Sequence, residues 1–277
     1  MARGLSFFYR RNQLSAEIRG KQVAEFVGGK QNPVDGYQHD VCILIKMLPG
    51  RLAFERGIHD CGPMYLDLVD HSTCLNWLAR NPALPVIVSS RSGMAYLSET
   101  LAMPNPLTFI PQHHCNVERV RRPHRPVRVV GYVGVDHAVT AHREKVTAAV
   151  EKMGLEMRWC TEFYTREDVV KAYQQIDIQF TWREGMPEKL LHLKNPLKIV
   201  NAASFGIPTV ANSEPSFLAE CRGRFVPALT IDDAIEQIDL LRGDANYYES
   251  FAEVGLALAE PYHLERVADL YRGLTRE

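Results

Sequence analysis

The feature that most constrains the fold is a regular alternation of apolar runs and amphipathic stretches between residues 125 and 242. Strand-like runs lie at 125–134, 156–163, 177–182, 207–211 and 224–228. Stretches with helical spacing lie at 142–155, 165–176, 195–205, 214–222 and 231–242. Strands that alternate with helices form parallel sheets with helices on both faces. The second half of the chain is therefore predicted to be one α/β domain.

The first half is less regular but also indicates an α/β domain. Strands are predicted at 5–10, 39–47, 64–70, 85–90 and 107–112, with helices at 16–29 and 72–81. A chain of 277 residues is longer than one core usually carries, which favours two domains. The expected boundaries are an N-terminal domain over 1–118, a polar, Pro-punctuated linker over 119–126 and a C-terminal domain over 127–260.

The last segment, 261–277, is expected to form an amphipathic helix that packs back on the N-terminal domain. Its apolar residues recur at helical spacing, which places them on one face of the helix. They are Leu264, Val267, Ala268 and Tyr271.

Composition excludes several classes of protein. The net charge is −1, so any contact with nucleic acid would require a local basic patch. The six cysteines contain no C-x-x-C pair, which argues against a zinc ribbon and a disulfide scaffold and favours a reducing, cytoplasmic setting. No apolar stretch approaches the roughly 18 residues of a membrane-spanning helix. A soluble cytoplasmic protein is expected.

Cationic side chains gather around the predicted helix at 196–205. Asn195 is a candidate cap for this helix, and Pro196 suits its first position. Lys194 and Lys198 are about one helical turn apart, and Arg183 ends the preceding strand. A helix N-terminus flanked by such cations is suited to bind a diphosphate without a metal. Solvated surface charges beside an ordinary cap are the alternative.

The C-terminal half resembles the donor domain of GT-B glycosyltransferases of the retaining, nucleotide-sugar-dependent group 1 type. The matching pieces are VRVVGYVG, DIQFTWRE, NPLKIVNAASFGIPTVANSEPSF and YHLERVADLYRGL. The resemblance implies two Rossmann-like domains that face each other across a cleft. It also assigns the donor diphosphate to Arg183 and Lys198, the donor ribose to Asn201, and the donor sugar to three residues after the following strand, Asn212, Ser213 and Glu214.

The sequence departs from that family in one important respect. The family commonly carries two glutamates separated by seven residues, but the corresponding positions here are Leu193 and Asn201. The segment GMPEKLLHLK, 185–194, is expected to be a loop over the donor. Glu184 and Glu188 are both candidates to replace the missing carboxylate.

The segment IPQHHCNVERVRRP, 110–123, occupies the place where the family's chain crosses between domains. A metal site at His113, His114 and Cys115 is disfavoured, because adjacent residues of an extended chain point in different directions and no second ligand cluster appears. A structural loop is one interpretation. The other is that His114 or Asn116 faces the cleft and takes part in catalysis.

In the first half, polar side chains follow the predicted strands, where an acceptor is expected to bind. They are Arg10, Arg11, Lys46, Asp70, His71, Ser89, Ser90 and Arg91. Asp70 alone has an equally simple interpretation as a helix cap.

Five arginines between 119 and 128 form a local basic cluster, which is either a solvated linker or a contact for nucleic acid. They are Arg119, Arg121, Arg122, Arg125 and Arg128. The expected function is transfer of a sugar from a nucleoside-diphosphate sugar to a hydroxyl acceptor, with retention and with no metal or other cofactor. A phage-type enzyme acting on hydroxymethylated pyrimidines in DNA and a catalytically silent nucleotide-sugar binder are the alternatives. The oligomeric state is left open.

Overall fold

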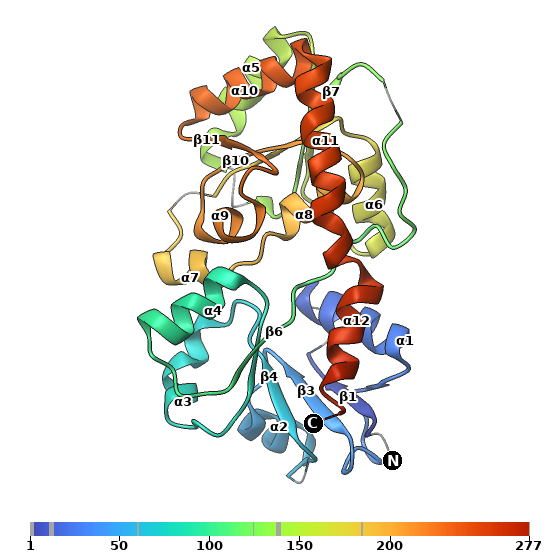
Figure 1. The fold of residues 1–277 in the computed structure, drawn as a ribbon, viewed down its shortest axis with the longest axis vertical. Coiled ribbons are helices and arrows are strands. Elements are labelled where there is room, and N and C mark those ends of the chain that lie inside the picture. The colour runs from blue at the N-terminus through green and yellow to red at the C-terminus, as the bar shows by residue number, and fades with distance from the viewer. Residues whose placement is uncertain are drawn as a thin grey trace. The chain divides into compact units, whose positions relative to one another are not determined.

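The computed structural model describes residues 3–10, 14–59, 61–123, 125–136, 140–183 and 185–276. These residues form two compact units, which are described separately below (Figure 1). Unit 1 comprises Met1–His113, Glu188–Asn195 and Leu264–Glu277, and unit 2 comprises His114–Pro187 and Pro196–His263. The chain therefore leaves unit 2 twice to contribute to unit 1. Among the described residues, no helix is both long and apolar enough to cross a membrane.

Unit 1 is built on a parallel sheet whose described strands run in the order β2-β1-β3-β4-β5-β6. The strands are β1 (Leu5–Phe8), β2 (Lys30–Gln31), β3 (Val41–Ile45), β4 (Met64–Asp67), β5 (Val86–Val88) and β6 (Leu107–Phe109). All five residues of β3, VCILI, are buried. Such uninterrupted apolar runs are typical of parallel strands, because helices cover both faces of the sheet. The predicted α/β class of the first half is confirmed.

The helices of unit 1 are mostly short. They are α1 (Val23–Val27), α2 (Pro49–Arg56), α3 (Leu75–Ala79), α4 (Arg91–Ala95), α7 (Glu188–Leu193) and α12 (Leu264–Gly273), and a π-helical segment, Ala16–Gln22, leads into α1. Helix α1 ends at Gly28, whose φ of 70° is a left-handed conformation that glycine adopts without strain. Helix α2 lies between β3 and β4, where the sequence analysis predicted no helix.

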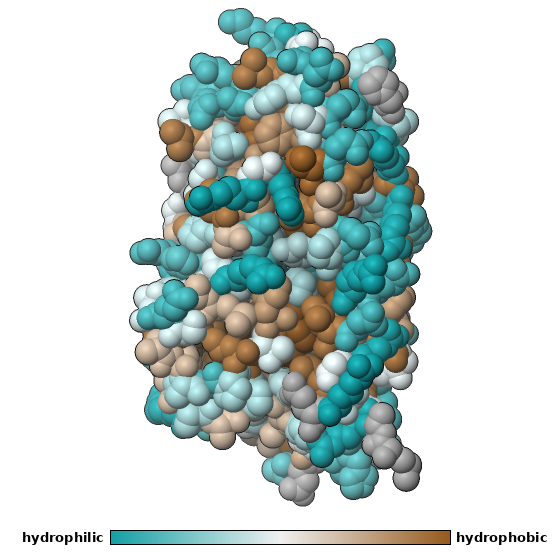
Figure 2. All heavy atoms as spheres, viewed as in Figure 1, coloured by the Kyte–Doolittle hydropathy of each residue, from teal (hydrophilic) through white to brown (hydrophobic). Residues whose placement is uncertain are grey.

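The C-terminal helix α12 is amphipathic and lies against α1 (Figure 1). Its four predicted apolar residues are all buried, as expected. Hydrophilic side chains cover its outward face in Figure 2. The buried Tyr271 hydroxyl donates to Asp67 Oδ2 at 2.7 Å, and Arg19 Nε donates to the same oxygen at 2.6 Å. This buried triad ties α12 to strand β4.

Unit 2 is also built on a parallel sheet, whose described strands run in the order β11-β10-β9-β7-β8. The strands are β7 (Val129–Val133), β8 (Glu156–Cys160), β9 (Ile178–Thr181), β10 (Thr209–Asn212) and β11 (Val226–Ala228). The helices are α5 (Arg143–Lys152), α6 (Arg166–Gln174), α8 (Leu197–Ser204), α9 (Pro215–Cys221), α10 (Ile231–Gly243) and α11 (Ala245–Ala259). Every strand and helix predicted for this half is present.

Two local features explain why these helices form where they do. Helix α6 begins with a capping box, in which the Thr165 hydroxyl accepts from Asp168 N and the Asp168 carboxylate accepts from Thr165 N. Helix α11 packs closely on α8, because a β-carbon at Gly255 would lie only 3.3 Å from the β-carbon of Ala203. Helix α11 thus packs along α8, and the two helices lie side by side in Figure 1.

The segment 119–126, expected to be a linker, is bound to unit 2 by ion pairs. Asp177 Oδ1 accepts from Arg122 Nε at 3.0 Å and from Arg125 Nη2 at 2.8 Å, and Arg119 Nη2 reaches Glu260 at 3.1 Å. Arg121 pairs with Glu253. The basic cluster is therefore largely neutralised by carboxylates of unit 2.

Candidate functional site

The candidate site lies at the carboxyl ends of β7 and β9 in unit 2. Strand order reverses here, because β7 pairs with β8 on one side and with β9 on the other. Ligands of open parallel sheets bind at such a reversal, outside the carboxyl ends of the strands. Three residues lie at these strand ends: Tyr132 at the end of β7, Gly134 just after it, and Arg183 just after β9.

Lys198, in the first turn of α8, reaches this position with its ammonium group. Its Nζ donates to Tyr132 Oη at 2.7 Å and lies 4.2 Å from the centroid of the Tyr132 ring. The Tyr132 hydroxyl in turn donates to Val135 O at 2.9 Å, so its lone pairs face the lysine. Burial raises the pKa of Tyr132 to about 12, although the Arg183 guanidinium opposes the shift. Tyr132 therefore stays neutral and holds the cation in place.

Gly134 leaves room for that ammonium group. A β-carbon at this position would lie 2.6 Å from Lys198 Nζ and 2.7 Å from Tyr132 Oη. Such separations are shorter than van der Waals contact, so a side chain here would displace the lysine. Sequence reasoning did not identify Tyr132 or Gly134, although the strand-end pattern GYVG was the available signal.

Arg183 forms an ion pair with Glu214, the residue that precedes α9. The Arg183 side chain is 10% exposed and that of Glu214 is 1% exposed. Burial raises the pKa of Glu214, while the nearby Arg183 guanidinium favours its charged form. Ser216 Oγ donates to Glu214 Oε1 at 3.1 Å, and the Arg183 guanidinium lies over the Phe217 ring at 5.2 Å. The arginine is therefore held in one orientation by α9.

The residues predicted to contact the donor sugar have different environments. Asn212 pairs with the main chain of Arg183, donating to its carbonyl at 2.9 Å and accepting from its N–H at 3.2 Å. Asn212 thus fixes where the arginine leaves the sheet. Ser213 is exposed, whereas Glu214 is buried beside Arg183.

Asn201, predicted to bind the donor ribose, is engaged within unit 2. Its Oδ1 accepts from Cys115 N at 2.9 Å, and the residue is 8% exposed. These contacts show it fastening the segment after residue 114 to α8. A ribose contact by Asn201 stays a prediction.

The two predicted catalytic residues, His114 and Asn116, are both buried in unit 2. Asn116 donates to Ser204 O and Val120 O, each at 2.8 Å, and accepts from Val120 N at 2.9 Å. The side chain has no exposed surface, so these contacts describe a structural role. His114 stacks edge-on against His263 with ring centroids 5.4 Å apart. A catalytic role for either residue stays a prediction.

Two expectations about the segment before α8 are wrong. Residues 188–193 form helix α7, which packs on unit 1 through the buried Leu193 and through His192, whose ring stacks on Tyr96 at 4.9 Å. A loop over the donor is therefore not seen there. The N-cap of α8 is Pro196, and the Asn195 amide donates to Gln112 Oε1 at 2.7 Å.

Two glutamates, Glu184 and Glu188, were the candidates to replace the missing carboxylate. Glu188 is largely exposed on α7. Glu184 and Arg11 lie outside the described residues. Within the described part of the chain, no three His, Cys, Asp or Glu side chains are placed to hold a metal ion. Metal independence stays a prediction.

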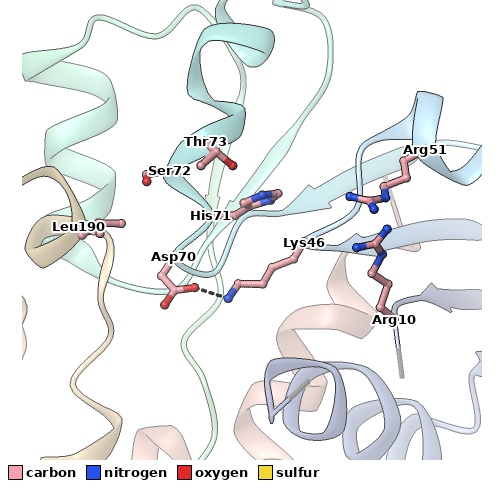
Figure 3. A pocket seen from close by; sticks show the side chains of 8 residues that line it. All are labelled: Arg10, Lys46, Arg51, Asp70, His71, Ser72, Thr73 and Leu190. Carbon is pink, nitrogen blue, oxygen red and sulfur yellow. Dashed lines mark ion pairs between the residues drawn. The ribbon is translucent and has the colours of Figure 1, made fainter. Parts of the chain in front are cut away.

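Several polar residues predicted to follow the strands of unit 1 do meet in one pocket, which Figure 3 shows. They are Arg10, Lys46, Asp70 and His71. Asp70 does not cap a helix, because its carboxylate pairs with Lys46 and Lys194. Ser89 and Ser90 are buried, and Ser90 caps α4.

Comparison with solved structures identifies the fold. Sucrose-phosphate synthase from Thermosynechococcus elongatus matches with a TM-score of 0.61 and 15% identity, over 96% of this chain and 80% of that chain. Anabaena HepE, solved in complex with UDP, matches with a TM-score of 0.59 and 14% identity, over 96% of this chain and 85% of that chain.

A third structure is an alpha-glucosyltransferase in complex with UDP and a 13-mer DNA containing an HMU base. It matches with a TM-score of 0.54 and 9% identity over 100% of both chains. No known protein-family profile matches the sequence, and no characterised protein matches it by sequence. The chain has the GT-B fold, with two parallel-sheet α/β units, as the sequence predicted.

Proposed function

We propose that this protein is a glycosyltransferase that moves a sugar from a nucleoside-diphosphate sugar to a hydroxyl acceptor. The observation that carries the proposal is the pair of cations, Lys198 and Arg183, at the strand-order reversal of unit 2. Both side chains are held by neighbours rather than extended into solvent. A preorganised pair of cations is what a departing diphosphate requires.

The proposed chemistry places the new negative charge of the reaction on the leaving diphosphate. Cleavage of the bond between the sugar and the diphosphate leaves an electron pair on the diphosphate oxygen. The Lys198 ammonium group, fixed by the neutral Tyr132 hydroxyl, stabilises that charge without reorganising. The positive end of the α8 dipole adds to the effect.

Arg183 binds the diphosphate and Glu214 at the same time in this proposal. A guanidinium group has five N–H donors, and Glu214 accepts from Nη1. Glu214 is thus a positioning residue for the arginine. Its second oxygen, Oε2, has no hydrogen-bond partner among the described residues, which leaves one acceptor for a hydroxyl of the donor sugar. Sugar or ribose contacts by Asn201, Asn212 and Ser213 belong to the same proposal.

Retention at the anomeric carbon and independence of a metal are also part of the proposal. Their support is the resemblance of the sequence motifs to the retaining group 1 enzymes, together with the cation pair that takes the place of a metal at the diphosphate. A cytoplasmic location is also proposed, because the scattered cysteines are typical of a protein in a reducing compartment.

The experiment is a calorimetric titration with UDP as the probe, followed by an assay of UDP-sugar turnover. Replacement Lys198→Met should weaken UDP binding about ten-fold or more, because it removes a charge-assisted contact. Lys171→Met, which removes an exposed lysine of α6, is the matched control and should bind UDP like the wild type. Equal binding by both variants would refute the site. Binding of UDP and UDP-sugars with neither hydrolysis nor transfer would favour a silent binder.

Transfer to a hydroxymethylated pyrimidine in DNA is a second candidate. The observation that favours it is the match of the DNA-bound alpha-glucosyltransferase over the full length of both chains. Against it, the arginines at 119, 121, 122 and 125 are paired with carboxylates of unit 2. A complex with hydroxymethyluracil-containing duplex that weakens steeply with salt would support the DNA acceptor.

A further inference from the structure

Unit 1 has a pocket at the same topological position as the donor site of unit 2. Strand order reverses at β1, which pairs with both β2 and β3. Arg10 follows β1 and Lys46 follows β3, and both line the pocket. Its volume, about 360 Å³, is within the roughly 300–1,000 Å³ of small-molecule sites. The pocket thus has the place and the size of a ligand site.

The side chains around the pocket carry a surplus of positive charge. Figure 3 shows the guanidinium groups of Arg10 and Arg51 near one another on one side, with Lys46 reaching Asp70 on the other. Both arginines pair with a single carboxylate, Glu55, and Arg51 Nε lies 2.5 Å from it.

Asp70 is likewise shared between two cations, Lys46 and Lys194. The described groups at the pocket are therefore four cations against two carboxylates, Glu55 and Asp70, a surplus of two positive charges. A phosphate monoester carries a charge of about −1.5 to −2 at pH 7, which matches this surplus. A phosphodiester carries only one negative charge.

The wall between these cations offers hydrogen-bonding groups for hydroxyls. His71 Nδ1 is buried and has no hydrogen-bond partner among the described residues. Burial and the nearby Lys46 ammonium lower the pKa of His71, so the imidazole is neutral at pH 7 and has one donor and one acceptor nitrogen. The adjacent Ser72 and Thr73 also line the pocket.

Two residues of the pocket region have strained backbone. Lys46 has φ of 50°, and Val69, just before Asp70, has φ of 53°. This left-handed region is unfavourable for residues other than glycine, most of all for a β-branched valine. Such strain concentrates where a structure holds side chains in a required direction. Here it turns Lys46 and Asp70 toward each other at the strand ends.

We propose that this pocket binds the acceptor of the transfer reaction, and that the acceptor is a small hydroxyl-bearing phosphate monoester. Arg10, Arg51 and Lys46 bind the phosphate, and His71 hydrogen-bonds a hydroxyl. That the ligand is the acceptor rests on the proposed function, whereas phosphate binding by the pocket does not. The charge match and the small volume favour a monoester over a nucleic acid.

The test is isothermal titration with inorganic phosphate, glucose 6-phosphate and glucose. The titrations use the Lys198→Met protein, so that anion binding at the donor site does not contribute. Glucose 6-phosphate should bind at least about ten-fold more tightly than glucose, because only the phosphate can pair with the cations. Adding Lys46→Met should weaken the binding of glucose 6-phosphate and of phosphate about ten-fold. Adding Arg80→Met, which removes an exposed arginine at the C-cap of α3, should not.

The outcomes separate this proposal from the proposed function. The pocket proposal is supported if the double variant Lys198→Met/Lys46→Met loses phosphate binding while the single variant Lys46→Met binds UDP like the wild type. Absence of UDP binding with phosphate binding intact would refute the donor site and leave the phosphate pocket standing. Equal affinities for glucose and glucose 6-phosphate would overturn the pocket proposal. So would binding of a hydroxymethyluracil oligonucleotide that depends on Lys46 without any binding of glucose 6-phosphate.

Discussion

Gly134 lies directly after β7, where a β-carbon would meet the Lys198 ammonium at 2.6 Å and the Tyr132 hydroxyl at 2.7 Å. In a Gly134→Ala variant, Lys198 Nζ must retreat by roughly 1 Å to regain a normal separation of about 3.5 Å. That movement breaks its 2.7 Å hydrogen bond to Tyr132. The lysine tip is the flexible end of a long side chain, so the fold itself should remain.

The variant should lose most of its affinity for the donor while it remains folded. A charge-assisted hydrogen bond contributes about 1.5–3 kcal/mol, which corresponds to roughly 10- to 150-fold in affinity for UDP. The free energy of unfolding should fall by about 1–3 kcal/mol, because the new methyl group also lies 2.7 Å from the hydroxyl of the buried Tyr132, which must shift.

The assay is calorimetric titration with UDP, with urea unfolding as the stability measurement. Gly243→Ala is the matched control in the same unit, because a β-carbon there has nothing within 4 Å. It should bind UDP like the wild type. A folded Gly134→Ala protein with wild-type affinity for UDP would show that the position of Lys198 does not matter, and would refute the reasoning.

Two further variants test the framework of unit 1. Arg19→Met leaves the buried carboxylate of Asp67 without its cation, so the free energy of unfolding should fall by about 3–5 kcal/mol in urea denaturation; a loss below 1 kcal/mol would contradict this. At Asp70, burial raises the pKa but Lys46 and Lys194 outweigh it, so the pKa is lowered from 3.8 to about 2. The stabilisation is therefore present above about pH 4 and is lost as pH falls through about 2. Asp70→Asn should cost about 2 kcal/mol at pH 6 and only a small fraction of that near pH 2, and a pH-independent difference would contradict the assignment.

The elements of unit 2 are predictable because local pattern and tertiary packing agree there. Apolar runs bounded by Gly or Pro become buried strands, and the Thr165 capping box starts α6 where the sequence places it. The same holds for α12 in unit 1, whose apolar stripe is the face that packs. In each case the spacing of the apolar residues in the sequence matches the residues that are buried in the structure.

Other elements are missed because their local signals are ambiguous. Helix α2 begins at Pro49 and contains Gly50, which as a pair are more typical of a turn. Helix α11 is a long, mostly apolar stretch whose helical face is less distinct. Helix α7 belongs to unit 1 although its neighbours in sequence belong to unit 2. A local sequence pattern does not predict which unit a helix packs against.

The candidate site is only partly predictable for a related reason. Arg183 and Lys198 are identified from strand-end and helix-start positions, which sequence does report. Asn116 and Asn201 were predicted to contact substrate, but their amides bind main-chain groups distant in sequence. The partner of Arg183, Glu214, is also distant in sequence. Such pairings depend on tertiary structure, so residue type alone does not distinguish a binding group from a structural one.

The central claim is that Lys198 and Arg183 bind the diphosphate of the donor at the carboxyl ends of β7 and β9. A crystal structure of the protein with UDP tests it most directly. Diphosphate oxygens should lie about 3 Å from Lys198 Nζ and from the Arg183 guanidinium. A diphosphate bound elsewhere, out of contact with both side chains, would contradict the account.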